Sequence, residues 1–167
     1  MIDVLIDKLT NSVEEVATGL SFDTRIAKAQ LRDIRSLDNS WRFDWKLELK
    51  QHEVFKLTIP DVGSDVQGLI SLRLEDGFIQ VVLIESHPAN VGRTKRFAGV
   101  AGNLMAFAAK RSIDVGNDGF IAFDAKSELI DHYSKTLGAR RVGTSQRMVV
   151  YPAQAAKLVE HYFGGAQ

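Results

Sequence analysis

The residues best suited to chemistry lie in a basic, glycine-rich stretch near the middle of the chain. Residues 89–111 include five basic side chains and no acidic one, and the glycines there are Gly92, Gly99 and Gly102. A helix start exposes unpaired N–H groups at the positive end of its dipole, and glycines let a phosphate approach the backbone. The pattern predicts an anion site, suited to a pyrophosphate. A solvated basic loop before a tightly packed helix shows the same pattern, and the residues alone leave both interpretations open.

The elements around this stretch must place it between a buried strand and a helix. The periodicity predicts strands at Phe43–Leu49, Val54–Ile59, Gln67–Leu74, Phe78–Ile84 and Gly119–Phe123, and two more within Arg140–Tyr151. It predicts helices at Thr24–Leu37, Gly99–Arg111, Lys126–Leu137 and from Pro152 onward, and it leaves Met1–Val16 ambiguous between a strand and a helix. This order favours an α/β (α+β) fold with a mixed, mostly antiparallel central sheet flanked by helices.

A known family becomes recognisable at the helix start. Arg96-Phe97-Ala98-Gly99-Val100-Ala101 matches a Gln/Arg-x-x-Gly-x-Gly/Ala signature, and in this context the chain resembles the GNAT superfamily of N-acetyltransferases. Downstream, Tyr133 with Leu137-Gly138-Ala139 is similar to the Tyr-x-x-x-Leu-Gly-Phe helix ending of that family. The resemblance covers Phe78–Tyr151. It implies one domain over 1–167, with a variable part (1–42), a strand meander (43–85), an acyl-CoA-binding core (86–151) and a C-terminal helix (152–163).

The resemblance implies acetyl-CoA, or another acyl-CoA, as cofactor, and no metal. Its pyrophosphate would lie on the N–H groups of residues 97–102, and its pantetheine arm along the strand ending at Glu85. Ser127 stands where many relatives place a cofactor-binding asparagine. The implied cofactor-binding residues are Ile84, Lys95, Arg96, Phe97, Ala98, Gly99, Val100, Ala101, Gly102, Ser127 and Tyr133.

The reaction implied is direct attack of an amine on the thioester, which needs a base and an acid. Glu85 is the candidate base and Tyr133 the candidate acid; otherwise Glu85 is a strand-end carboxylate paired with an arginine, and Tyr133 a packed aromatic. His87 is an alternative base, although a His-Pro turn is more often structural. His132 is expected at the surface.

Three departures from the family pattern keep an alternative open. The segment between Pro88 and Arg96 is longer and more basic than usual, Ala139 replaces an aromatic residue, and Ser127 replaces the asparagine. A GNAT-like acyl-CoA-binding or protein-interaction module without turnover is the alternative. The aromatic cluster Trp41–Trp45 is interpreted as packing at the start of the sheet, or else as a pocket in which Asp44 holds a cationic amine.

Composition limits the remaining classes. The 21 basic and 21 acidic residues give zero net charge, which argues against nucleic acid as a partner. Cysteine is absent, which excludes thiol catalysis and cysteine-based zinc sites, and the four histidines are scattered. No stretch approaches the roughly 20 apolar residues of a membrane span, so we expect a cytoplasmic protein. The expected partners are a small-molecule or protein amine and, through the last helix, a second copy in a homodimer.

Overall fold

The computed structural model describes residues 1–8 and 12–164, so that residues 9–11 of the ambiguous Met1–Val16 element lie outside the described residues. The strands are β1 (Val13–Glu15), β2 (Ser21–Phe22), β3 (Arg25–Lys28), β4 (Glu53–Thr58), β5 (Gly68–Glu75), β6 (Phe78–Ser86), β7 (Phe97–Ala98), β8 (Ile121–Asp124), β9 (Arg140–Arg141) and β10 (Arg147–Val150). The helices are α1 (Leu31–Arg35), α2 (Trp45–Gln51), α3 (Val100–Asp114), α4 (Ile130–Leu137) and α5 (Pro152–Phe163), with 3₁₀ turns η1 (Pro88–Asn90) and η2 (Ser127–Leu129).

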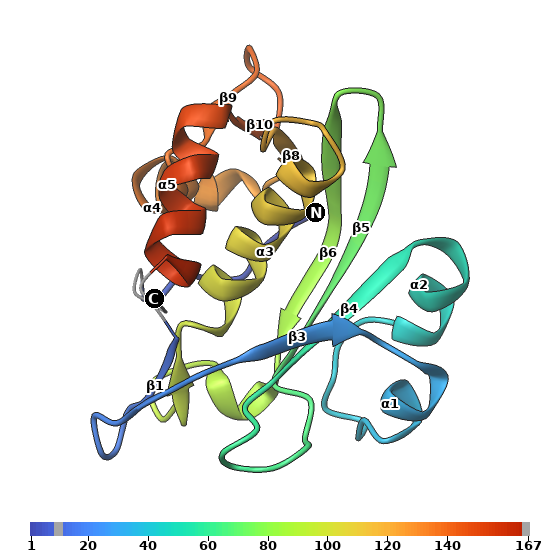
Figure 1. Cartoon of the computed structure of the whole chain (residues 1–167), viewed down its shortest axis with the longest axis vertical. Helices are drawn as coiled ribbons and strands as arrows, with labels where there is room; N and C mark the ends of the chain where they lie inside the picture. The colour runs from blue at the N-terminus through green and yellow to red at the C-terminus, as the bar shows by residue number, and fades with distance from the viewer. Residues whose placement is uncertain (9–11, 165–167) are drawn as a thin grey trace.

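The central sheet has seven strands in the order β3-β4-β5-β6-β8-β10-β9 (Figure 1). Within the described residues, β6 and β8 are the parallel pair of this sheet, and its other neighbours are antiparallel. A second, small sheet joins β2, β1 and β7. The mixed, mostly antiparallel sheet expected from the sequence is therefore confirmed.

β6 and β8 part after a short ladder. Their register pairs Ile79 with Ile121 and Gln80 with Ala122, whereas β6 runs on to Ser86. Figure 1 places the N-terminus beside these strands, and Ile2 forms a parallel bridge with Ala125, just beyond β8. The first residues of the chain therefore lie where the two strands diverge.

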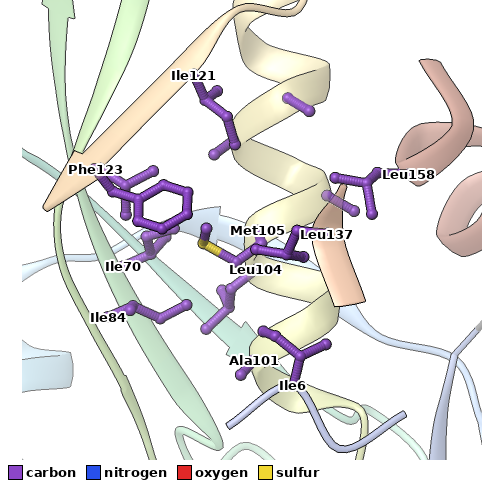
Figure 2. Close-up of a cluster of buried hydrophobic side chains, with 14 of the residues drawn as sticks. Ile6, Ile70, Ile84, Ala101, Leu104, Met105, Ile121, Phe123, Leu137 and Leu158 are labelled. Atoms are coloured by element: carbon purple, nitrogen blue, oxygen red, sulfur yellow. The ribbon is translucent and has the colours of Figure 1, made fainter. Parts of the chain in front are cut away.

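Helices cover both faces of the sheet. Successive residues of a strand point to opposite faces. Leu69 accordingly packs in the cluster that contains Trp45 of α2, while Ile70 packs in the main core with Leu104 and Met105 of α3 (Figure 2). The larger core thus lies under α3 and α5, and α1 and α2 cover the opposite side.

The predicted strand at Phe43–Leu49 is wrong, because these residues enter α2. The Asp44 carboxylate accepts the Leu47 N–H at 3.0 Å and caps the helix. The side chains that α2 buries, Trp45 and Glu48, follow helical spacing, whereas Leu47 is 48% exposed. The alternation of leucines with charged residues was therefore not a buried strand face.

The predicted helix at Thr24–Leu37 is also wrong over its first half. Residues 25–28 form the edge strand β3, in which Ile26 pairs with Leu57 of β4. Only Leu31–Arg35 is helical. Pairing with β4, which no local pattern reveals, outweighs the helical spacing of the apolar residues here.

The remaining predicted elements are confirmed with small shifts at their ends. The Glu75-Asp76-Gly77 turn joins β5 to β6, Gly138 ends α4 with a φ of +65°, and Pro152 begins α5. The apolar side chains of α5, such as Leu158, are buried in the main core beside α3. That face is used inside the chain and does not supply the dimer surface suggested from the sequence.

Candidate functional site

The start of α3 holds an anion, and the anion is a side chain of the same molecule. Gly99 caps the helix with a φ of +100°, a conformation that favours glycine. Its N–H donates to one oxygen of the Asp7 carboxylate at 2.9 Å, and the Lys95 ammonium donates to the other at 2.8 Å. We call the Gly99 N–H and the Lys95 ammonium the anion corner. The predicted anion site is thus a corner in which a backbone N–H and a cation meet.

Other groups of the predicted pyrophosphate loop have different partners. Phe97 donates its N–H to the Asn90 side chain at 3.1 Å, and Phe97 and Ala98 form β7, which pairs with β1. The Arg96 guanidinium lies 3.8 Å from Glu15 and above the Phe97 ring. Only part of the predicted loop therefore faces the anion corner.

The first turn of α3 is closely packed. Val100, Ala101 and Gly102 are buried. A Cβ atom at Gly102 would overlap the hydroxyl of Tyr162 and lie 3.0 Å from the Lys8 carbonyl, to which that hydroxyl donates a hydrogen bond. The glycine therefore allows α5 and the first residues of the chain to approach α3.

Residues Met1–Lys8, the N-terminal segment, cross the place where β6 and β8 diverge. Ile2 donates its N–H to the Asp124 carbonyl at 2.7 Å, and its own carbonyl accepts the Lys126 N–H at 2.9 Å. Ile6 donates its N–H to His132 Nε2 at 2.9 Å. Ile2 and Ile6 are 2% and 5% exposed, so the segment is seated in the main core.

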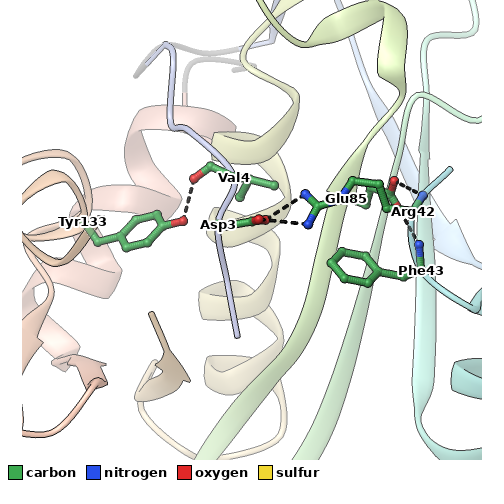
Figure 3. Close-up of polar contacts among 6 residues, drawn as sticks. All are labelled: Asp3, Val4, Arg42, Phe43, Glu85 and Tyr133. Carbon is green, nitrogen blue, oxygen red and sulfur yellow. Dashed lines mark hydrogen bonds and ion pairs between the residues drawn. The ribbon is translucent and has the colours of Figure 1, made fainter. Parts of the chain in front are cut away.

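Tyr133 lies under the N-terminal segment. It is fully buried on α4, and its hydroxyl donates to the Val4 carbonyl at 2.5 Å (Figure 3). Its ring packs edge-on against Phe123. Burial, with a smaller contribution from Asp3, raises the pKa of Tyr133 well above its ordinary value. The hydroxyl therefore keeps its proton at neutral pH and acts as a donor.

Glu85 is a buried acceptor near the end of β6. Its carboxylate accepts the Arg42 N–H at 2.6 Å, the Phe43 N–H at 3.3 Å and the Trp45 indole N–H at 2.8 Å. Figure 3 shows the first two of these bonds. The side chain is 5% exposed. Glu85 thus joins β6 to the chain that leads into α2.

The Arg42 guanidinium ties the same region to the N-terminal segment. It donates to the two oxygens of Asp3 at 3.2 and 3.0 Å (Figure 3), and this hydrogen bonding raises the pKa of Arg42. Trp45 is 1% exposed and Asp44 caps α2. The packing interpretation of the Trp41–Trp45 cluster is confirmed, although the cluster leads into a helix and not into the sheet.

A cavity of about 450 Å³ lies between the N-terminal segment and the end of β6. Asp3, Val4 and Asp7 line one side, and Ile84 and Glu85 line the other, with the 88–95 loop and the start of α3 nearby. The structure thus brings together Glu85, Ile84, Lys95 and Val100 of the predicted site around one space.

Three other candidates have structural partners. His87 accepts the Ala89 N–H at Nδ1 and caps η1, which is the structural role considered for it. Exposed Ser127 bonds to Gln146 at 2.8 Å. His132 is half-buried and not a surface residue as expected, and burial lowers its pKa from 6.5. It accepts the Ile6 N–H because its Nε2 carries no proton.

The N-terminal segment was not predicted from the sequence as part of the site. The signal was present in Asp3 and Asp7, two acids four residues apart in an apolar stretch.

Within residues 1–8 and 12–164, no cluster of three or more His, Cys, Asp or Glu side chains is suited to a metal ion. In the same described ranges, no helix has the length and apolarity needed to cross a membrane.

No model of a known protein family matches the sequence, and no curated protein matches it significantly. Solved structures do match. AtaTR bound with acetyl-CoA gives a TM-score of 0.51 at 18% identity, with 81% of this chain and 98% of that chain covered. The KacTA–DNA complex gives 0.53 at 17% identity (81% and 98% covered). AtaT complexed with acetyl-methionyl-tRNAfMet gives 0.51 at 18% identity (82% and 99% covered). The fold is the GNAT-like acyltransferase fold.

Proposed function

We propose that this chain is an acyl-CoA-dependent N-acyltransferase that transfers an acetyl group from acetyl-CoA to a primary amine. The observation that carries the proposal is the anion corner, where Gly99 and Lys95 together bind a carboxylate beside the divergence of β6 and β8. AtaTR, which shares the fold, is bound with acetyl-CoA in its solved structure. The fold and the anion corner together support this cofactor class.

The donors of the anion corner suit a pyrophosphate. The Asp7 carboxylate makes contacts of 2.9 and 2.8 Å there, which are the contacts that two phosphate oxygens would make. Beyond Gln80, β6 no longer pairs with β8, so its edge near Ile84 suits the amides of a pantetheine arm. The residues fit acyl-CoA once the N-terminal segment has moved, because it crosses the same places.

The cofactor supplies an activated acetyl group as a thioester. An amine nitrogen forms the new bond to the acetyl carbon, the carbon–sulfur bond breaks, and the sulfur takes a proton. We assign the proton donor role to Tyr133, whose hydroxyl carries a proton at neutral pH and lies beneath the segment that crosses the cofactor path. The hydroxyl must leave the Val4 carbonyl to act in this way.

We assign the amine proton to Glu85. One of its oxygens accepts both the Phe43 and Trp45 N–H groups, while the other accepts the Arg42 N–H alone. A carboxylate oxygen has two lone pairs, so the second oxygen can accept a further proton, directly or through water. Glu85 lines the cavity.

The acceptor end of the cavity is the end at Glu85. Once the N-terminal segment has moved with Asp3 and Asp7, the charged side chains left in the lining are Glu85, Arg42 and Lys95. We propose a small-molecule or protein amine as the acceptor, because the Glu85 carboxylate attracts an ammonium group. The structure of AtaT with acetyl-methionyl-tRNAfMet adds the amine of an aminoacyl-tRNA to the acceptor classes worth testing.

A module without turnover is the second candidate function. The observation that favours it is the N-terminal segment itself, which crosses the cofactor path with Ile2 and Ile6 buried. In that case the fold would serve binding to another molecule, and no thiol would be released with any amine.

The test is a titration with CoA and acetyl-CoA in which binding is measured by thermal unfolding and calorimetry. Thiol release is then measured over a panel of amines. We expect both ligands to raise the unfolding temperature, because a ligand bound only by the native state stabilises it. The variant Lys95→Glu should lose this effect. Lys110→Glu is the matched control, since Lys110 lies on α3 and pairs with Asp114 outside the cavity.

The outcomes separate the two candidates. Ligand binding with thiol release supports the acyltransferase, and ligand binding without release on any amine supports the module. If neither ligand binds the parent chain or a variant with a weakened N-terminal segment, the acyl-CoA proposal is rejected.

A further inference from the structure

We propose that the N-terminal segment (Met1–Lys8) is a built-in competitor of acyl-CoA, so that the chain blocks its own cofactor groove until the segment is released. This inference rests on the proposed function and adds its regulation. The segment contacts three groups that the cofactor would need: the Tyr133 hydroxyl, the anion corner and the region where β6 leaves β8. One stretch of eight residues therefore engages all three of these groups.

The chemistry at the anion corner is that of a competitor. Asp7 places a negative charge on the Gly99 N–H and the Lys95 ammonium. A segment that merely covered the core would need no carboxylate there, since apolar residues suffice for burial. Asp7 instead reproduces the charge and the two-point contact of a phosphate, which is what a competitor at this position requires.

The middle of the segment reproduces a second feature. The Val4 carbonyl accepts the Tyr133 hydroxyl at 2.5 Å, the group to which we assign proton donation (Figure 3). While this bond exists, the hydroxyl cannot donate to a thioester sulfur. The segment thus engages both the binding group and the reactive group of the groove.

The N-terminal segment has one face buried in the core and one face exposed. Ile2 and Ile6 are buried in the main core, where Figure 2 shows Ile6 beside Ala101 at the start of α3. Met1 and Leu5 are each 58% exposed. Asp3 pairs with Arg42, whose side chain is 61% exposed. Buried and exposed residues alternate, as they do in a strand that occupies a groove.

Release of the N-terminal segment would leave a groove whose charge and apolar floor match acyl-CoA. The anion corner and Arg42 would lose their carboxylate partners, and the apolar floor under Ile2 and Ile6 would be uncovered. A positively charged end next to an apolar channel fits a thioester of a phosphorylated nucleotide. The affinity measured for such a ligand is the affinity of the open groove multiplied by the fraction of molecules in which the groove is open.

The test weakens the competitor without removing its buried residues. Asp7→Ala deletes the carboxylate but keeps Ile2 and Ile6, and Asp7→Asn keeps one acceptor for the Gly99 N–H. Asp114→Ala is the matched control, because Asp114 is a surface acid paired with Lys110. CoA is the probe, its affinity is measured by calorimetry, and hydrogen exchange follows the amides of residues 2–8.

We expect CoA affinity to rise in the order parent, Asp7→Asn, Asp7→Ala, by about tenfold between the ends, because the groove is open more often. The control should bind as the parent does. Saturating CoA should also remove exchange protection from Ile2 and Ile6 in the parent chain. This second readout holds even if a variant folds poorly.

Two results would overturn the inference and are distinguishable. Equal CoA affinity in all variants, with the protection of residues 2–8 unchanged by CoA, rejects the competitor and leaves the proposed function standing. Absence of CoA binding in the parent and in both folded Asp7 variants rejects the competitor together with the proposed function.

Discussion

Replacing Glu85 by glutamine tests how the candidate site is held together. The carboxylate accepts three N–H groups, whereas a glutamine side chain offers a single oxygen and two N–H donors of its own. In its best orientation the glutamine oxygen keeps the Phe43 and Trp45 bonds. Its NH₂ group then faces the Arg42 N–H, and the shortest of the three bonds, at 2.6 Å, is lost.

The size of the effect follows from that loss. A hydrogen bond to a charged group contributes about 1.5–3 kcal/mol. Glu85 is 5% exposed, so water replaces it poorly, and we expect Glu85→Gln to lower the free energy of unfolding by about 2 kcal/mol. For a chain of this length that corresponds to a fall in Tm of about 4–8 °C.

Urea and thermal unfolding measure this change, and an unaltered urea m-value would show that the unfolded state is the same. Glu128→Gln is the control, because Glu128 is exposed in the first turn of η2 and should change stability by less than about 0.5 kcal/mol. If Glu85→Gln is as stable as this control, Glu85 does not anchor the Arg42–Trp45 chain, and the assignment of its hydrogen bonds is wrong.

Two further expectations concern the N-terminal segment. Tyr133→Phe leaves the Val4 carbonyl without its donor, so the free energy of unfolding in urea should fall by about 1 kcal/mol. Thiol release should drop, whereas CoA affinity should not fall, because the same change weakens a contact of the N-terminal segment. Unchanged turnover would remove Tyr133 from the reaction. His132 has a lowered pKa, so its contribution to stability is complete above pH 6.5 and is lost as the pH falls below 6.5 toward the folded-state pKa. Unfolding curves between pH 7.5 and 5 should show this loss, and His132→Gln should flatten it.

Local signals determined several of the elements around the candidate site. The Asp76-Gly77 turn between two apolar runs, the glycine that caps α3 and Pro152 at the start of α5 each act through the backbone of a few neighbouring residues. Such effects are legible in the sequence because conformation is set within a turn or two. The fold class and the candidate anion site at the α3 start were predicted from them.

Local signals misled where tertiary contacts prevailed. Residues 45–51 alternate like a strand, but Asp44 caps a helix that buries Trp45 beneath the sheet. Residues 25–28 have helical spacing, but β4 offers them a ladder. In both places the energy of packing against a distant element exceeds the small local preference.

The tertiary structure alone decided what occupies the candidate site. Asp7 meets Gly99 across 92 positions, and the Tyr133 hydroxyl meets Val4 across 129. No periodicity or motif encodes contacts at that separation, because they exist only after the sheet and α3 have formed. The sequence thus indicated an anion at the start of α3 as one of two interpretations, and the packing of the whole chain determined that the Asp7 carboxylate lies there.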